Sequence, residues 1–412
     1  MSQHLHHRTG RRAFLKAAGG IAGALALGSR TWATRLILVA TGQTNPISQV
    51  EWIVYDTGLQ DAAGDPVHRC AIRITTTAGA QGWADFDGWT APDGPTARLI
   101  KDMLLGRELT EHESLWHQLY QQGIPLGTLG AVDVALWDLK GRIEGQPICA
   151  LLGAKRQQVA GCVSTGFNLG GPLEYANFAS ACKEQSAHGV KIQTAAGKPE
   201  QDIAVYGAVR EAVGSDFACI AGGAAAYTYE QALQVGQELD ELDYAWFQSP
   251  MPENDEWVAR YVALTGALET PVCAPETERG SYQSRVTWVE RAACDIPCID
   301  VHYGGLTACV ELAQACESKG IRLELNNVGP DAYAHLQLLG ATDETLIEHV
   351  EMLSLSSMGV PPMNHGHDAR ATLPGRVSAE PALNEQGYIA IGQAPGMGLE
   401  LDWKYIFTHR VS

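Results

Sequence analysis

The chain has 412 residues, of which 45% are hydrophobic and 18% charged, a composition typical of a soluble globular enzyme with one large domain and a smaller companion. The formal net charge is −18, because 47 acidic residues outnumber 29 basic ones. The first 33 residues hold five of the basic residues and no acidic one, which leaves 24 basic against 47 acidic residues, or −23. So acidic a surface repels nucleic acid and anionic lipid, and excludes both as expected partners.

The N-terminus carries a paired-arginine motif, GRRAFLK, at residues 10–16, with Arg11 and Arg12 as the pair. The apolar, Gly- and Ala-rich run at residues 17–28 is too short to span a bilayer, which needs about 20 residues. It ends in small residues suited to cleavage after Ala26 or Ala33. The pattern predicts a twin-arginine (Tat) signal peptide over 1–33 rather than a buried helix. We therefore expect a periplasmic or other extracytoplasmic protein, exported folded, with no membrane attachment after cleavage.

Ten cysteines would suit a disulfide framework in an exported protein, but Cys162, Cys219 and Cys273 lie inside apolar, strand-like runs. No C-x-x-C pair with zinc spacing occurs, since even the close pair Cys294 and Cys298 has three residues between its members. We expect most of the cysteines to be reduced, small, buried side chains, with one surface disulfide as the alternative.

The elements expected after the signal begin with three short alternating or β-branched runs, which predict an antiparallel meander at 48–55, 70–76 and 82–86. Three helical patterns follow, at 96–105, 110–121 and 129–144. Together they predict an α+β domain over residues 46–155.

From Cys162 onward, apolar strands alternate with amphipathic helices at intervals of 23 to 28 residues. Eight such units predict a closed parallel (β/α)8 barrel over 158–375, because each parallel crossover needs a returning helix. A segment at 376–412, irregular over 381–405, returns toward the first domain. The strands begin near Cys162, Val190, Phe217, Ala245, Val272, Cys298, Ile321 and Leu346. Amphipathic patterns predict helices at 172–188, 199–213, 228–239 and 306–319.

The C-terminal ends of the strands form the active-site face of such a barrel. A polar residue at one strand end is usually structural, but eight ends converge on one mouth. The residues at these ends form a strongly polar set in which Gly222 is the exception: Lys191, Gln193, Gly222, Gln248, Glu276, Asp300, His302, Asn326, Asn327, Glu348 and His349.

Several segments between about residue 47 and residue 403 resemble the mandelate racemase and muconate lactonizing enzyme branch of the enolase superfamily. They are AVDVALWDLKG at 131–141, LLG at 151–153, AVREAVG at 208–214, GGLT at 304–307 and the closing segment at 395–403. The resemblance implies an α/β fold, with an N-terminal α+β capping domain over a modified (β/α)8 TIM-type barrel, and a homo-oligomer. It also implies a lyase or isomerase whose base removes the proton next to a carboxylate, while a divalent metal stabilises the enediolate.

The metal site departs from the family's pattern. In similar proteins three acidic side chains, at the ends of the third, fourth and fifth barrel strands, hold one Mg²⁺. Here Gly222 and Gln248 stand at the first two positions, and Glu276 alone is acidic. One carboxylate and one amide form a weak site, because Mg²⁺ favours anionic oxygens. Either the usual site is lost or it is rescued by a substrate carboxylate or by a nearby acid, namely Glu278, Asp300 or Glu324; no other cofactor is expected.

The base positions are partly kept. Similar proteins often end the second strand with Lys-x-Lys, and here Lys191 is present while Gln193 replaces the second lysine. On the opposite face a histidine is usually supported by an aspartate. Asp300 is kept, whereas Asn326 or Asn327 stands at the histidine's position.

His302 and His349 are the two candidates for the missing base, with a structural histidine as the alternative for each. His302 lies two residues beyond Asp300, so strand alternation directs both side chains to the same side. Glu348 resembles the acid that hydrogen-bonds the substrate carboxylate or the enediolate.

Two loops of the capping domain, at 85–94 and 121–128, are candidates for substrate selection over the mouth. Asp87, Trp89 and Asp93 offer hydroxyl-binding and stacking groups for a sugar-like ligand, with plain loop decoration as the alternative.

Three functions stay open. The first is a dehydratase or epimerase acting on a hydroxy acid or sugar acid by proton abstraction, with Lys191, Asp300 and His302 as acid and base groups. The second is a metal-independent lyase or isomerase with a remodelled site. The third is a non-catalytic ligand-binding protein on a degenerate scaffold, since fold alone never guarantees function. The amine and carboxylates kept at strand ends favour an enzyme.

Overall fold

The computed structural model describes residues 44–60, 64–86, 91–165, 169–194, 197–276, 282–325, 332–345, 349–352, 374–378 and 381–411. The predicted signal peptide lies outside these residues, as do Asp87, Trp89, Glu278, Asn326, Asn327 and Glu348; of His349 the backbone alone is described. No helix among the described residues is long and apolar enough to cross a membrane.

The N-terminal part begins with the predicted meander. β1 (Ile47–Gln60), β2 (Pro66–Thr76) and β3 (Gln81–Phe86) pair antiparallel in that order. The helices that follow are α2 (Gly94–Leu104), a 3-10 turn η1 (Leu109–Glu111), α3 (His112–Gln121), α4 (Leu126–Glu144) and α5 (Ile148–Leu151). The predicted order of strands and helices is confirmed.

Helix α4 is the central element of this part, because it is buried along most of its length. It lies so close to β3 that a Cβ on Gly82 would come within 2.3 Å of the Leu139 backbone nitrogen. Near its start, a Cβ on Gly130 would come within 2.6 Å of the Val301 carbonyl oxygen, in the turn that follows barrel strand β9. Helix α4 therefore packs directly against the turn that carries Asp300 and His302.

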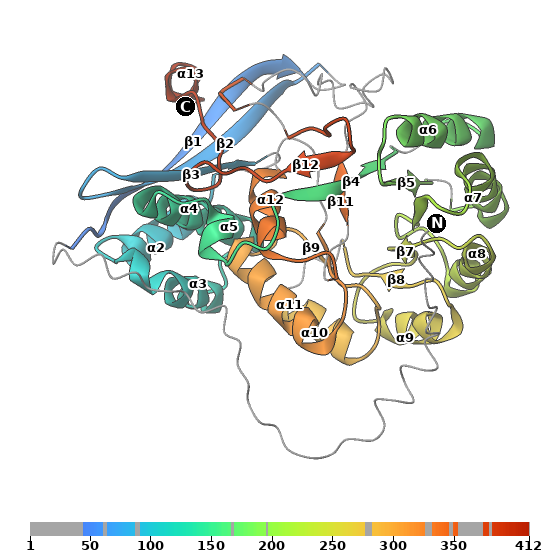
Figure 1. Cartoon of the computed structure of the whole chain (residues 1–412). Coiled ribbons are helices and arrows are strands. Elements are labelled where there is room, and N and C mark those ends of the chain that lie inside the picture. Colours follow the sequence, from blue (N-terminus) through green and yellow to red (C-terminus); the bar gives the residue numbers. More distant parts are fainter. Residues whose placement is uncertain are drawn as a thin grey trace.

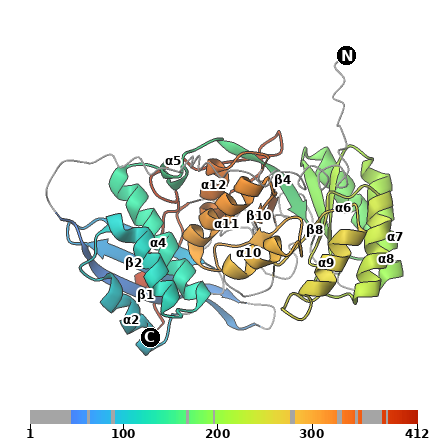
Figure 2. The same cartoon turned by 90° about the horizontal axis from the view of Figure 1, so that it is seen from below.

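The barrel follows. Its parallel strands are β4 (Gln158–Ser164), β5 (Gly189–Gln193), β6 (Ala218–Gly222), β7 (Trp246–Gln248), β8 (Val272–Cys273), β9 (Cys298–Ile299), β10 (Glu324–Leu325) and β11 (His349–Met352). The helices are α6 (Pro172–Glu184), α7 (Pro199–Val213), α8 (Tyr229–Glu241), α9 (Val258–Ala267), α10 (Tyr282–Glu290), α11 (Gly305–Lys319) and α12 (Ala332–Ala341). As Figure 1 shows, α6 to α9 surround β4 to β8 on the outside, and α10 to α12 lie between these strands and the N-terminal part. The perpendicular view in Figure 2 agrees. The predicted fold class is confirmed.

Pairing around the barrel is uneven. One sheet joins its strands in the order β11-β4-β5-β6-β7-β8, while β9 and β10 form a separate parallel pair of two residues each. Between β8 and β9 the described pairing is an isolated bridge from Cys273 to Ile296. The wall formed by β8, β9 and β10 thus has the shortest strands of the barrel.

The predicted helix at 172–188 was too long at its end. Helix α6 ends at Glu184, and Ser186 takes a left-handed φ of 64°. The Ala187 amide donates to the Cys182 carbonyl oxygen at 3.0 Å, which terminates the helix before β5 begins.

The C-terminal segment was predicted to be irregular, but it contains β12 (Tyr388–Ala390), which pairs antiparallel with β4, and α13 (Trp403–Thr408). This segment also contacts the N-terminal part. Trp83 Nε1 donates to the Leu399 carbonyl oxygen at 2.9 Å, and the Met397 amide donates to Asp138 Oδ1 at 2.7 Å.

All ten cysteines lie in the described residues, and each is buried and forms no disulfide. The prediction of small buried thiols is confirmed, and the alternative of a surface disulfide is wrong. The side chains contribute to the packed interior of both parts of the molecule.

Candidate active site at the barrel mouth

Strand β5 directs Lys191 and Gln193 into the barrel. Its alternate residues Val190 and Ile192 are buried in the apolar cluster shared with the surrounding helices, so the residues between them point to the opposite side. The Lys191 side chain is 1% exposed. The positive charge of its ammonium acts to lower the pKa of the Cys298 thiol, on β9. Lys191 therefore extends into the interior between β5 and β9.

Gln193 occupies the space at the family's first metal position. A Cβ added to Gly222 would come within 2.2 Å of Gln193 Oε1. The amide of Gln193 therefore lies where an acidic side chain at position 222 would begin. The two replacements that the sequence shows, glycine for an acid and glutamine for a lysine, are in contact.

The other two metal positions lie on the next strands. Gln248, at the end of β7, is buried; its Nε2 is 3.9 Å from Cys298 Sγ, and its Oε1 has no hydrogen-bond partner among the described residues. Glu276 follows β8 and accepts a hydrogen bond from Ser249 Oγ at 2.9 Å. This donor set of one carboxylate and one neutral amide does not fit a Mg²⁺ site built from three acids.

Asp300 and His302 form a hydrogen-bonded pair directly after β9. His302 Nδ1 lies 2.5 Å from Asp300 Oδ1, and the His302 backbone amide donates to the same oxygen at 2.8 Å. The Asp300 side chain is 9% exposed and that of His302 is 20% exposed. The carboxylate is thus the inner member of the pair, and the imidazole is the member that a ligand can reach.

A second histidine, His335 of α12, also faces Asp300. Its Nε2 lies 3.3 Å from both the Val301 amide nitrogen and Asp300 Oδ1. Burial raises the pKa of Asp300, but hydrogen bonding and electrostatic interaction with the imidazoles of His302 and His335 outweigh it and hold this pKa well below its usual range. Asp300 therefore stays ionised, and it fixes the proton of His302 on Nδ1.

The backbone after β6 and β7 is strained. Ala224, Ala225 and Ser249 have φ values of 50°, 56° and 45°, a left-handed conformation that costs a non-glycine residue about 1 kcal/mol or more. The Ala225 amide donates to the Ser249 carbonyl oxygen at 2.7 Å, which holds the two turns together. Such strain clusters at functional sites, and here it adjoins Gly222 and Gln248.

The structure thus brings together seven of the predicted residues at or near the C-terminal ends of β5 to β9: Lys191, Gln193, Gly222, Gln248, Glu276, Asp300 and His302. The remaining candidates, Asp87, Trp89, Asn326, Asn327, Glu348 and the side chain of His349, lie outside what the structure describes.

The predicted role of Asp93 in ligand binding is not what the structure favours. Asp93 caps α2, accepting the Thr96 amide at 2.7 Å. At the start of the same loop, Asp85 is buried between Arg69 and Arg376, at 3.1 and 3.0 Å. Both carboxylates therefore stabilise the fold.

Sequence reasoning missed several polar residues beside this site. His335 and Arg285 lie on barrel helices, where the strand-end rule does not apply. Arg285 is fully buried, and its Nε donates to the Cys298 carbonyl oxygen at 2.7 Å. Cys273 was assigned to the apolar interior, yet its Sγ lies 2.7 Å from Glu324 Oε2. Strand alternation on β8, β9 and β10 was the available signal for this last contact.

Relatives with known activities resemble the chain over most of its length. It is 26% identical to D-galactarolactone cycloisomerase of Agrobacterium fabrum over 349 residues, which cover 80% of this chain and 88% of the relative. It is 24% identical to L-talarate/galactarate dehydratase of Salmonella typhimurium over 326 residues, 77% of each chain. These relatives are lyases and isomerases of sugar acids and their lactones, which supports the predicted enzyme class.

Solved structures resemble it as well. The crystal structure of D-glucarate dehydratase from Agrobacterium tumefaciens, complexed with magnesium, superposes with a TM-score of 0.76 at 25% identity and covers 89% of this chain and 99% of that one.

Family models match both parts of the chain. Residues 67–153 match the N-terminal domain of mandelate racemase and muconate lactonizing enzyme, and residues 174–405 match the enolase C-terminal domain-like family. The chain therefore belongs to the mandelate racemase and muconate lactonizing enzyme family of the enolase superfamily.

Proposed function

We propose that this enzyme is a dehydratase, cycloisomerase or epimerase that removes the proton next to the carboxylate of a sugar acid or a related hydroxy acid. His302 would be the base, Asp300 the residue that positions it, and Lys191 the cationic group between β5 and β9. The observation that carries the proposal is the Asp300–His302 pair, a buried carboxylate joined at 2.5 Å to a partly exposed imidazole.

The chemistry explains why both groups are needed. A proton on a carbon beside a carboxylate is very weakly acidic, so its removal needs a placed base and nearby positive charge. Asp300 holds the Nδ1 proton of His302, which leaves Nε2 to accept the substrate proton, and its negative charge stabilises the imidazolium that forms. The C–H bond breaks, its proton passes to Nε2, and the electron pair moves into the carboxylate.

Lys191 supplies the positive charge in this proposal. Its ammonium is buried, and in a water-poor interior a charge acts more strongly on a developing anion than it does in water. The intermediate then either expels a neighbouring hydroxyl group, which leaves as water with the proton held by the His302 imidazolium, or regains a proton on the face opposite to the one that lost it. The first outcome is a dehydration and the second is an epimerisation.

Magnesium is bound in a solved relative, but we assign no step to it here. The contact between Gln193 and the space above Gly222, together with the neutral amide of Gln248, supports a site without tight Mg²⁺ binding. We further propose, from the motif at 10–16 and from the family resemblance, that the enzyme is exported folded and acts as a homo-oligomer outside the cytoplasm.

The test is hydrogen–deuterium exchange in D₂O, followed by NMR, over a panel of aldaric acids, aldonic acids and their lactones. We expect exchange or turnover with at least one of them, lost in His302→Asn and retained in His117→Asn, a surface histidine paired with Glu311 at 2.9 Å. Turnover by His302→Asn at the wild-type rate would refute the assignment of the base.

Calorimetric titration with Mg²⁺, with total metal content measured on the same sample, tests the remaining part of the proposal. We expect no stoichiometric binding at micromolar Mg²⁺, and turnover that survives removal of Mg²⁺ by a chelator. Tight stoichiometric binding would show that Glu276 has found replacement ligands, and would return the enzyme to the metal-dependent mechanism.

A further inference from the structure

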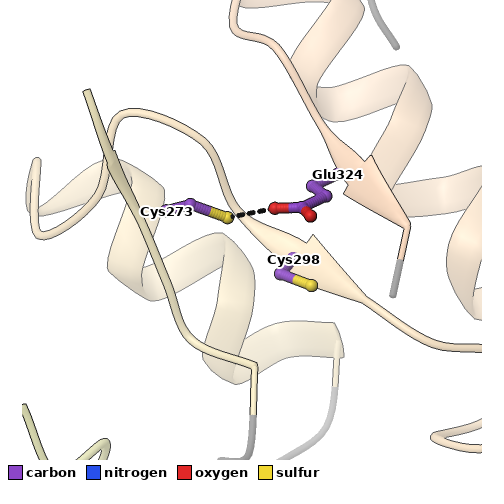
Figure 3. Close-up of side chains that lie close together, drawn as sticks. All are labelled: Cys273, Cys298 and Glu324. Atoms are coloured by element: carbon purple, nitrogen blue, oxygen red, sulfur yellow. Dashed lines mark hydrogen bonds between the residues drawn. The ribbon is translucent and has the colours of Figure 1, made fainter. Parts of the chain in front are cut away.

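Three potential metal ligands meet inside the barrel, and none of them belongs to the Asp300–His302 pair. Cys273 of β8, Cys298 of β9 and Glu324 of β10 are all buried, and their ligand atoms lie within 4.8 Å of one another. Cys273 Sγ lies 2.7 Å from Glu324 Oε2, and Figure 3 shows the three side chains converging from their three strands. We propose that these residues bind one thiophilic divalent ion, with Zn²⁺ as the best match.

The ligand set differs in kind from a magnesium site. Thiolate sulfur is a soft ligand that Zn²⁺ accepts readily, whereas Mg²⁺ requires oxygen ligands. Cysteine sulfur and glutamate oxygen both ligate Zn²⁺ in proteins, although the ligands come here from three separate strands rather than from a C-x-x-C motif.

The observed separations are close to those that zinc needs. Zn–S bonds of about 2.3 Å and Zn–O bonds of about 2.0 Å place tetrahedral ligands roughly 3.3–3.8 Å apart. The contact between Cys273 and Glu324 would widen by about 1 Å, and the largest separation in the cluster, which is at most 4.8 Å, would shrink by about 1 Å or less.

Gln248 provides an independent observation that points to a ligand. Its buried Oε1 has no hydrogen-bond partner within the described part of the chain, while its Nε2 lies 3.9 Å from Cys298 Sγ. Such an orphaned buried oxygen calls for an explanation. The two amide atoms exchange places when the amide turns over, which would put the oxygen about 3.9 Å from Cys298 Sγ, close to the separation of two ligands on one zinc ion. Gln248 would then be the fourth ligand.

The position of the cluster gives the ion a structural role. It spans β8, β9 and β10, the shortest strands among the described residues of the barrel, and Cys273 forms the isolated bridge to Ile296, just before β9. A bound ion would join all three strands, and its binding free energy would add to the stability of this wall.

Binding requires both thiols to lose their protons. Two S–H bonds break, two S–metal bonds form, and two protons pass to solvent. Burial raises the pKa of Cys273, so the thiols stay protonated without a metal, and the affinity is expected to fall as the pH falls.

Cobalt substitution tests the proposal without reference to activity. The full chain, freed of metal by a chelator under reducing conditions, is titrated with Co²⁺ and then with Zn²⁺. We expect one equivalent of Co²⁺ to give the near-ultraviolet charge-transfer band of thiolate coordination, and Zn²⁺ to abolish it. That band distinguishes Co²⁺ bound by cysteine thiolates from Co²⁺ bound by histidines elsewhere in the chain.

Matched variants locate the site. Cys273→Ala and Cys298→Ala should lose the band and weaken Zn²⁺ binding on the order of 100-fold or more, since even supporting residues of metal sites are worth 10- to 100-fold. Cys219→Ala, an equally buried cysteine of β6 that faces the helices, should keep both. If a cluster variant does not fold, the wild-type band and its stoichiometry still decide.

Three results would overturn the proposal. The first is the absence of a thiolate band in reduced wild-type protein, and the second is a band that persists in both cluster variants. The third is a Cys273–Cys298 disulfide, found by mass spectrometry of the protein as purified without reductant, which would make the pair a redox cross-link instead.

Discussion

Replacing Asp300 with asparagine isolates the contribution of one negative charge to the proposed base. Asp300 Oδ1 accepts from the His302 backbone amide at 2.8 Å and from His302 Nδ1 at 2.5 Å, and an asparagine oxygen can accept both. The geometry therefore survives, but the charge that stabilises a protonated imidazole is lost. We expect kcat to fall by about 10²–10⁴-fold, the contribution typical of a positioned general base, with KM changed by only a few-fold.

The pH profile gives this prediction its direction. A neighbouring carboxylate favours the charged imidazole, so its removal lowers the pKa of the base and moves the acid limb of kcat/KM to lower pH. Stability changes as well. The folded-state pKa of Asp300 is lowered, so the carboxylate stabilises the fold above its unfolded pKa, and this contribution is lost as the pH falls through the folded value. The stability difference between wild type and Asp300→Asn should therefore be largest near neutral pH and shrink in acid.

The assay is the initial rate of exchange or turnover as a function of pH, with chemical denaturation run on the same samples. Glu311→Gln is the matched control, because Glu311 pairs with the surface histidine His117 at 2.9 Å and lies outside the proposed site. An Asp300→Asn enzyme with unchanged kcat and an unmoved acid limb would refute the positioning role.

Three further predictions follow from the same structure. Lys191→Met should lower kcat by about 10²–10³-fold, the loss typical of removing one group that stabilises a developing anion. The far-ultraviolet circular dichroism spectrum should stay unchanged. Full activity in this variant would refute the role of the ammonium. Gly130→Ala should lower the free energy of unfolding by about 1–3 kcal/mol in a denaturant titration, because its Cβ would come within 2.6 Å of a backbone oxygen in the turn after β9. Gly207→Ala in α7 is the control. Nothing lies within 4 Å of its new Cβ, so this change should be neutral or stabilising in the same titration. Changing both Arg11 and Arg12 to lysine should leave folded, active protein in the cytoplasm, as cell fractionation would reveal, and undiminished export would contradict the predicted signal.

Local pattern in the sequence was enough to predict the architecture. Alternating residues at 48–55, 70–76 and 82–86 predicted the meander, and the regular spacing of apolar strands predicted the barrel. Both patterns are local, because the periods of a strand and of a helix are set by the backbone itself. The strand-end rule also identified Lys191, Asp300 and His302, since parallel strands in a barrel all end at one mouth.

The sequence also showed that positions 222 and 248 lack acidic side chains. It did not show which side chain fills the space that this leaves. Which side chain fills the space over Gly222 depends on the pairing of β5 with β6, and the structure places Gln193 there. The same holds for β12, whose pairing with β4 joins residues more than 200 positions apart.

What the tertiary structure alone decided is which polar side chains share an environment. His335 lies on a helix with no local sign of function, yet it faces Asp300 because α12 packs beside the turn after β9. Cys273, Cys298 and Glu324 each follow an ordinary apolar strand pattern, and they meet because three neighbouring strands direct alternate residues to the same interior. Sequence periodicity determines which face of an element a residue occupies, whereas the contacts between faces are fixed by closure of the barrel, which brings together segments far apart in the chain.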